Sequence, residues 1–266
     1  MSRNSERGIV WLSRIFILVA FLTGWEFLPS IAALRSAIPL FDPFVISSPT
    51  RIARELWALA SGHGAPSVWP YLLKTLESTV VGTAIGIAAG AIIGLILCNS
   101  QLLAEIWEPF ITLLNATPRI ALIPIMVIIF GPNGVATAAG AVLLVSFITF
   151  YNAFEGGRAI APEVLQNARI LGCSKWGVMF RIRGPYVMAW TFATVPNAVS
   201  FGLVGVVTGE VLSGVAGMGS LLTTAINSVE ATLTFGVVVY LAFFGLLLVS
   251  IVSLLRRRLL HWWTVS

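Results

Sequence analysis

The sequence predicts an all-α membrane protein, and two observations indicate this fold class. Hydrophobic residues make up 58% of the 266 residues and charged residues only 10%, whereas soluble domains carry about 25% charged residues. The apolar runs are also long and continuous, unlike the roughly 10-residue segments of alternating hydrophobicity that form transmembrane β-strands. We therefore predict a single transmembrane domain over residues 1–266.

Six runs are long enough to cross a bilayer as helices, because a span needs about 20 apolar residues. They lie at about residues 9–28, 75–98, 110–131, 134–153, 186–209 and 233–255. The first run follows arginines, as a signal peptide would, but it contains Trp25 and Glu26 and lacks a small-x-small cleavage site. We expect residues 1–28 to be retained as an N-terminal span, followed by an external segment at 29–72 and a core of five spans at 73–256.

The Lys and Arg residues predict that both termini lie in the cytoplasm. This orientation leaves four basic residues outside, namely Arg35, Arg51, Arg54 and Lys74, with Arg119 near the inner boundary. It places eleven inside: Arg3, Arg7, Arg14, Arg158, Arg169, Lys175, Arg181, Arg183, Arg256, Arg257 and Arg258. The two cysteines then lie near the reducing side of the membrane, as expected for free thiols.

The external segment contains a sequence typical of a capped amphipathic helix. Ser48 and Pro49 precede a stretch of alternating basic and apolar residues that ends near Leu59. One interpretation is an interfacial helix that lies on the outer leaflet. The other is a docking site for an extracytoplasmic partner.

Glycine recurs every fourth residue in the second predicted span, at Gly82, Gly86, Gly90 and Gly94. This spacing places the four glycines on one helix face, where the missing side chains allow another helix to approach closely. The ridge predicts tight packing within the subunit, and a gate helix that slides along the ridge is the functional alternative.

A polar stretch with two prolines lies at the third predicted span, where Pro118 and Pro124 flank Arg119. A charge inside a bilayer is costly and usually marks a pathway or a pair, but an arginine near a helix end reaches the interface easily. Both roles remain open for Arg119. Candidate pathway residues are polar groups in or near spans: Glu77, Asn115, Thr117, Arg119, Ser146, Asn197, Ser200 and Glu210.

The acid at the end of the fifth span, Glu210, is followed by Gly214, Gly217 and Gly219. A glycine-rich turn back into an apolar stretch predicts a re-entrant loop at the external face. Glu210 is then either a hydrogen-bonded residue of a helix end or part of an external gate or partner contact.

A polar, basic loop at residues 163–185 separates the fourth and fifth spans. We predict a short helix, a hinge and C-cap at Gly172, an N-cap at Ser174, and a second helix that Pro185 closes before the next span. The second helix places Trp176, Met179 and Phe180 together at offsets of 0, 3 and 4. An aromatic anchor surrounded by cations suits a groove on a partner protein, although the same residues also suit anionic headgroups.

Several other classes of function find no support in the sequence. The net charge of +5 comes from residues spread along loop ends, so we expect no nucleic-acid partner. Two histidines far apart, His63 and His261, do not predict a metal site, and no metal or catalytic cluster is apparent. A stand-alone secondary transporter or channel remains the alternative function, although Glu77 and Glu210 are too isolated to indicate a coupling-ion site.

The basic loop resembles the cytoplasmic loop of the membrane subunit of bacterial ABC importers. In that family the loop has Glu-Ala-Ala, three residues, Gly, nine residues, Ile, one residue and Leu-Pro. The same spacing here falls on Gln166, Asn167, Ala168, Gly172, Ile182, Gly184 and Pro185. The departures are Gln166 for Glu, Asn167 for Ala and Gly184 for Leu, and an ionic contact at the first of these is lost.

The resemblance extends beyond about residue 45. The Thr117–Pro124 stretch, Phe130-Gly131, and the segment from Glu210 through Gly217-Met218-Gly219 resemble the nitrate, sulfonate, taurine and bicarbonate branch. It implies a type I permease with six spans that dimerises around a central pathway in the bacterial inner membrane. It also implies a small anion as solute, since that branch carries such ions.

The resemblance further implies three kinds of partner: a second copy of this permease, two cytoplasmic ABC ATPase subunits, and a periplasmic or lipid-anchored solute-binding protein. The chain contains no Gly-x-x-x-x-Gly-Lys-Ser/Thr phosphate loop. We therefore expect no catalytic activity and no cofactor in this chain, because ATP and Mg²⁺ would be bound by the ATPase. The residues expected to couple the two proteins are Gln166, Asn167, Ala168, Arg169, Gly172, Trp176, Met179, Phe180, Ile182 and Pro185.

Overall fold

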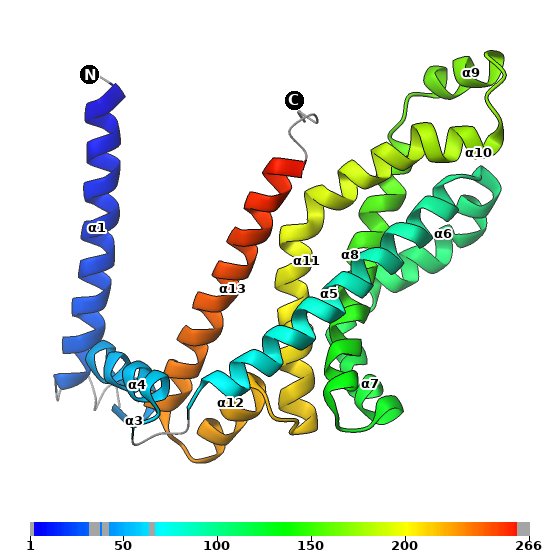
Figure 1. Cartoon of the computed structure of the whole chain (residues 1–266). Helices are drawn as coiled ribbons and strands as arrows, with labels where there is room; N and C mark the ends of the chain where they lie inside the picture. The colour runs from blue at the N-terminus through cyan, green and yellow to red at the C-terminus, as the bar shows by residue number, and fades with distance from the viewer. Residues whose placement is uncertain (1–2, 32–37, 39–42, 64–66, 260–266) are drawn as a thin grey trace. The chain divides into compact units, whose positions relative to one another are not determined.

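Helices make up the regular structure throughout the part of the chain that the computed structural model describes, residues 3–31, 38, 43–63 and 67–259 (Figure 1). Arg35, counted above among the external cations, lies outside the described residues. Contacts divide the chain into two units. The first consists of residues 1–69 and 221–240, and the second of residues 70–220 and 241–266.

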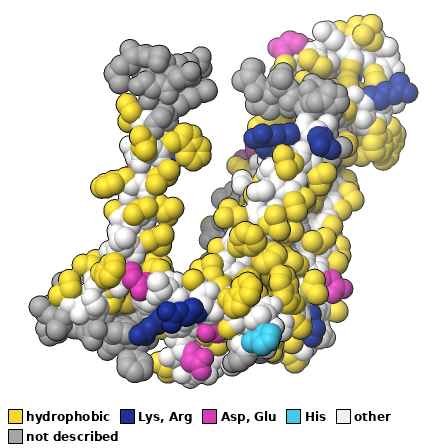
Figure 2. Space-filling model, turned by 60° about the vertical axis from the view of Figure 1, so that its left-hand side comes forward, with side chains coloured by type: hydrophobic (Ala, Val, Ile, Leu, Met, Phe, Trp, Pro, Cys, Tyr) yellow, Lys and Arg dark blue, Asp and Glu magenta, His cyan; other side chains and the backbone are white. Residues whose placement is uncertain are grey.

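Five helices are long and apolar enough to cross a membrane, and a bent pair raises the number to six if it counts as one span. Four of the five lie in α1 (Arg3–Phe27), α5 (Trp69–Cys98), α8 (Gly134–Arg158) and α13 (Ala231–Leu259). The fifth is α11 (Gly184–Ser213) with the turns that precede it. Hydrophobic side chains cover the visible sides of the long helices (Figure 2). The predicted all-α membrane fold is therefore confirmed.

The third predicted span, 110–131, is wrong as a continuous helix. Helix α6 (Gln101–Ala116) ends before Pro118, and a short turn, η3 (Arg119–Leu122), leads into α7 (Ile123–Phe130) after a bend of 91°. Thr117 adopts an extended conformation with φ −75° and ψ 130°, because a following proline disfavours the helical region. Pro118 also lacks the N–H that would continue the ladder. The pair is therefore either a broken span or a re-entrant segment.

In the second unit, α8 and α11 pack against each other along much of their lengths. Close approach at their crossing requires small residues, because a Cβ added at Gly205 would lie 2.8 Å from the carbonyl oxygen of Gly140. The glycine ridge of α5 packs against α8 in the same way. Its four glycines are buried, so the predicted tight packing is confirmed, while sliding of a gate helix along the ridge stays a prediction.

We expect Gly90→Ala to destabilise the second unit, because its Cβ would lie 2.5 Å from the carbonyl oxygen of Ser146 and 2.8 Å from the amide nitrogen of Phe150. Both neighbours are backbone atoms and cannot turn away, so the expected loss is about 1–3 kcal/mol. Unfolding of the purified chain in detergent measures it. Gly134→Ala is the matched control, since no atom lies within 4 Å of its Cβ. Equal stability of the two variants would contradict the packing argument.

In the first unit, the amphipathic helix predicted after Ser48 forms as α4 (Pro49–Ser61). Its cap differs from the expected one, because the Ser48 side chain makes no capping hydrogen bond. Instead the carboxylate of Glu26 accepts hydrogen bonds from the amide of Thr50 at 3.0 Å and from its hydroxyl at 2.7 Å. An acid at a helix N-terminus also complements the helix dipole. The cap therefore ties α4 to the end of α1.

Further polar contacts hold the first unit together. The indole Nε1 of Trp25 donates to the carbonyl oxygen of Ile46 at 3.3 Å, and its ring meets that of Phe235 edge to face. The hydroxyl of Tyr240 donates to the carbonyl oxygen of Leu56 at 2.7 Å. Short elements complete this unit: η1 (Leu28–Ser30), α3 (Pro43–Ile46) and most of α12 (Met218–Asn227).

Candidate functional site

The basic loop forms the helix, hinge and second helix that its sequence predicts. Helix α9 (Pro162–Ile170) ends before Gly172, which has a φ of +81°. This left-handed conformation costs glycine nothing and allows the amide of Cys173 to donate to the carbonyl oxygen of Ala168 at 2.9 Å. The hydroxyl of Ser174 then accepts from the amide of Gly177 at 3.1 Å, which caps α10 (Lys175–Val178). The predicted hinge and N-cap are confirmed.

The expectation that Pro185 closes the second helix is wrong. Helix α10 passes into a single π-helical turn, η4 (Met179–Arg183), and then directly into α11. Pro185 lies in the first turn of α11, where a missing N–H does little harm because the wider π turn has already shifted the hydrogen-bond register. The second helix of the basic loop therefore continues into a membrane-spanning helix without a break.

An exposed aromatic pair lies on this second helix. The rings of Trp176 and Phe180 stack with centroids 5.9 Å apart, and the two side chains are 69% and 60% exposed. Ile170 and Leu171 on the other side of the hinge are more than 80% exposed. We call these four residues the apolar face of the basic loop. Met179, expected beside them, is buried instead.

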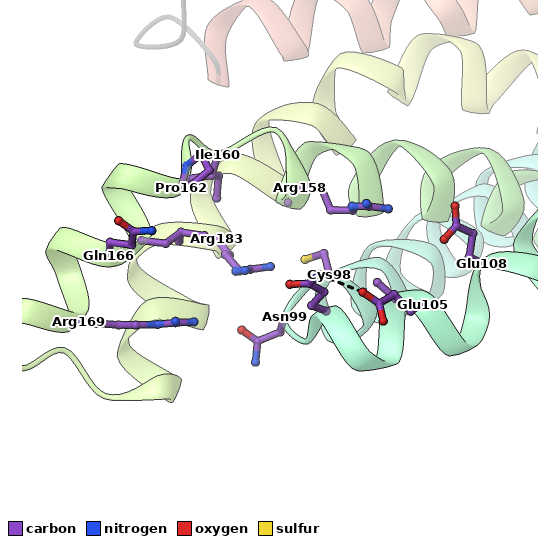
Figure 3. A pocket seen from close by; sticks show the side chains of 14 residues that line it. Cys98, Asn99, Glu105, Glu108, Arg158, Ile160, Pro162, Gln166, Arg169 and Arg183 are labelled. Carbon is purple, nitrogen blue, oxygen red and sulfur yellow. Dashed lines mark hydrogen bonds between the residues drawn. The ribbon is translucent and has the colours of Figure 1, made fainter.

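The remaining loop residues divide between surface and interior. Gln166, Asn167 and Arg169 are exposed on α9, while Ala168 and Ile182 are half-buried. Gln166 and Arg169 also line a cavity of about 530 Å³ between the basic loop and the ends of α5, α6 and α8 (Figure 3). Nothing in the sequence pattern placed those helix ends beside the loop.

A buried polar cluster surrounds Glu210, which is only 2% exposed. The hydroxyl of Thr75 lies 2.7 Å and 2.9 Å from its two carboxylate oxygens, and the amide of Gly219 donates to Oε2 at 2.8 Å. Thr75 in turn accepts from the amide of Met218 at 2.8 Å. A Cβ on Gly217 would collide with the carboxylate of Glu210. The cluster therefore fastens the turn after α11 to the first part of α5.

Glu210 and Glu77, both candidate pathway residues, line one cavity of about 580 Å³. Its wall also includes Lys74, Ser78 and Thr137 from α5 and α8. Glu77 is exposed whereas Glu210 is buried. Sequence reasoning missed Thr75, the main side-chain partner of Glu210, since a single threonine in an apolar run carries no distinguishing pattern.

The other candidate pathway residues do not line this cavity. Arg119 donates from Nη2 to the Oδ1 of Asn115 at 3.0 Å, and its guanidinium lies 5.7 Å from the ring centroid of Phe147. Arg119 thus has partners within the chain, one turn away and on α8. The hydroxyls of Thr117, Ser146 and Ser200 bond carbonyl oxygens of their own helices, and Asn197 is exposed.

Comparison with known proteins agrees with these features. The family described as binding-protein-dependent transport system inner membrane component matches residues 82–263. The chain is 29% identical to the riboflavin transport system permease protein RibX of Chloroflexus aurantiacus, over 84% of this chain and 82% of RibX. It is 22% identical to the taurine transport system permease protein TauC of Escherichia coli, over 92% of this chain and 87% of TauC.

A third relative is the bicarbonate transport system permease protein CmpB of Synechococcus elongatus, which is 27% identical over 92% of this chain and 87% of CmpB. The family match covers about two thirds of the chain, including the basic loop and the turn after Glu210. The resemblance drawn from the loop motif is therefore confirmed, and the chain belongs to the family of inner-membrane permease components of binding-protein-dependent ABC importers.

Proposed function

We propose that two copies of this chain form the translocation pathway of an ATP-driven importer and that each copy engages one of two ATPase subunits through its basic loop. The observation that supports this most directly is the apolar face. Four large side chains exposed on both sides of Gly172 are costly in water, and Lys175 and Arg181 are the sequence neighbours of Trp176 and Phe180. Such a surface suits a hydrophobic groove in a partner protein.

The join between the loop and α11 supports a mechanism of alternating access. Because α10, η4 and α11 form one helical run, a displacement of the loop is passed to a membrane-spanning helix without a flexible break. ATP binding to the partner subunits draws the two loops together and opens the pathway outward, and hydrolysis returns it. This chain supplies the bistable membrane element, which nucleotide and solute delivery both bias.

The orientation that we propose places both termini and the basic loop in the cytoplasm, because eleven of the sixteen Lys and Arg residues then lie inside. The turn that Glu210 fastens then faces a periplasmic or lipid-anchored binding protein. Single-cysteine labelling at the C-terminus and in α4 with a membrane-impermeant reagent tests this. Labelling of α4 in intact cells without labelling of the C-terminus is the expected result.

We further propose a small anion as the solute, such as a sulfonate, taurine, nitrate or bicarbonate. The taurine and bicarbonate permeases among the relatives support this, whereas the riboflavin permease offers a different chemistry. Uptake of labelled taurine, nitrate, bicarbonate and riboflavin by cells that express this chain together with its partner subunits decides between these solutes. Saturable riboflavin uptake without anion uptake would contradict the anion proposal.

The assembly is tested by native mass spectrometry of the tagged chain from its own organism in mild detergent. We expect a complex with two copies of this chain and two ATPase subunits that carry phosphate-loop motifs. Recovery of this chain alone under several mild detergents, together with transport that ignores ATP, would favour a stand-alone secondary transporter instead.

We expect Trp176→Ala to weaken binding of the ATPase at least about tenfold, because truncation of an exposed aromatic anchor removes its contact with the groove. The side chain is 69% exposed, so the stability of the chain itself should change little. Trp57→Ala is the matched control, since Trp57 is 77% exposed but lies on α4. Binding of purified ATPase to each variant in nanodiscs measures the effect. Equal binding by both variants would rule out docking through Trp176.

A further inference from the structure

We propose that this chain binds an oxyanion, a phosphate- or sulfate-type group, between the basic loop and the corner that joins α5 to α6. Two cavities of about 530 and 520 Å³ lie there, and both are lined by Arg169 and Arg183. Asn99 and Gln101 from the corner line both cavities as well. Figure 3 shows both guanidinium groups extending from the loop into the first cavity, opposite Asn99.

The second cavity has a strongly positive lining. Arg169, Lys175 and Arg183 meet there with Asn99, Ser100 and Gln101, and no carboxylate lines it. Three cations around one hollow repel one another unless an anion is placed between them. The cations come from α9, α10 and η4, so the basic loop folds in a way that gathers its positive charges on the side facing the corner.

The acids that line the first cavity form no ion pair with Arg169 or Arg183 in the described residues. These acids are Glu105 and Glu108, and Glu105 accepts a hydrogen bond from the Nε2 of Gln101 at 3.0 Å.

Arg183 supplies a second and independent observation. Its Nε is buried and has no hydrogen-bond partner in the described structure. The Arg183 side chain as a whole is half-buried, and a cation that has lost part of its hydration without an opposite charge is costly, so an anion beside its guanidinium is favoured.

A tetrahedral oxyanion satisfies this set of donors. A guanidinium presents its N–H groups in a planar fork that matches phosphate and sulfate oxygens. The site offers more donors than one small anion needs. They are the guanidinium groups of Arg169 and Arg183, the ammonium group of Lys175, and the side-chain amides of Asn99 and Gln101. The group comes from a free anion in the cytoplasm or from the phosphate of a lipid headgroup at the membrane surface, and both present the same oxygens to the site.

This inference concerns the isolated chain and does not rest on the proposed assembly with an ATPase. The test uses the full chain in dodecyl maltoside, a detergent without phosphate. Calorimetric titration with inorganic phosphate and with sulfate, against chloride at equal ionic strength, measures the free anion. Native mass spectrometry after addition of dioleoylphosphatidylglycerol measures the lipid. The variants are Arg169→Gln and Arg183→Gln.

Arg181→Gln is the matched control, because Arg181 is exposed on the same turn as Arg183 and lines neither cavity. We expect binding of one anion or one lipid per chain, weakened at least about tenfold by Arg169→Gln and by Arg183→Gln and unchanged by Arg181→Gln. Arg169 is exposed on α9, so its variant tests the site even if Arg183→Gln does not fold.

Saturable phosphate or sulfate binding with this pattern identifies a free anion, and lipid retention alone with the same pattern identifies a headgroup. Two results would overturn the proposal. One is the absence of both anion binding and lipid binding. If the Arg169→Gln and Arg183→Gln variants then also fail to bind the ATPase, a carboxylate of that subunit fills the site. The other is an equal loss of binding in Arg181→Gln, which would show that binding depends only on the net positive charge of the loop.

Discussion

Gly172→Trp is expected to insert normally in the membrane and to lower ATP-driven uptake at least about tenfold. Gly172 has a φ of +81°, a conformation that costs a residue with a side chain roughly 1–2 kcal/mol. No atom lies within 4 Å of a Cβ built there, so the indole projects outward beside the apolar face. The variant therefore disturbs both the hinge and the surface that we propose for docking, while the spans are unaffected.

Gly172→Asn separates these two effects, because asparagine tolerates the left-handed conformation better than other residues and adds little bulk. We expect it to keep most of the uptake. The measurements are uptake of the identified solute into proteoliposomes with internal ATP, and the amount of assembled complex. Wild-type uptake by a fully assembled Gly172→Trp transporter would contradict the proposal that this loop couples the permease to the ATPase.

Glu210→Ala is expected to lower the free energy of unfolding by about 2–5 kcal/mol, the second large effect. The substitution removes the carboxylate that accepts hydrogen bonds from the hydroxyl of Thr75 and the amide of Gly219, and a hydrogen bond to a charged group contributes about 1.5–3 kcal/mol. It also opens a cavity where a side chain now fills buried space. Release of the turn after α11 should accompany the loss, because that turn is fastened through the carboxylate.

Glu77→Ala is the control for this prediction. Glu77 lines the same cavity but is exposed, and surface substitutions usually change stability by less than about 0.5 kcal/mol. Denaturant unfolding in detergent gives the stability, and hydrogen exchange at residues 214–219 reports on the turn. If both variants lose the same stability, the buried cluster does not hold the turn as described.

The sequence predicted well those features that depend on residues close together in the chain. Gly172 and Ser174 identified the hinge and the second cap, because a left-handed residue and a hydroxyl acceptor act within one turn. Long apolar runs identified the spans, since the bilayer demands them regardless of packing. The spacing of the loop motif identified the family. The glycine ridge predicted a close helix contact, although not that α8 would be the partner.

Other predictions failed because a neighbouring element competed with local pattern. Offsets of 0, 3 and 4 group three side chains on one face of a regular α-helix, but Met179 packs into the interior while Trp176 and Phe180 stay exposed. Proline was expected to end the second helix of the basic loop at Pro185, and the run at 110–131 was expected to form one span. In the structure the helix continues past Pro185 into α11, and the chain bends by 91° between α6 and α7. In both cases the surrounding hydrogen-bond register decided the outcome.

The sequence by itself thus determined the class of the protein, most of its membrane-spanning helices, its hinge and its family. Only the tertiary structure decided which polar residues meet. Thr75 and Glu210 lie 135 residues apart, and the cations of the basic loop gather opposite a corner some 70 residues earlier in the chain. A hydrogen bond or a shared cavity depends on distance in space, and no periodicity within one helix encodes how two helices meet.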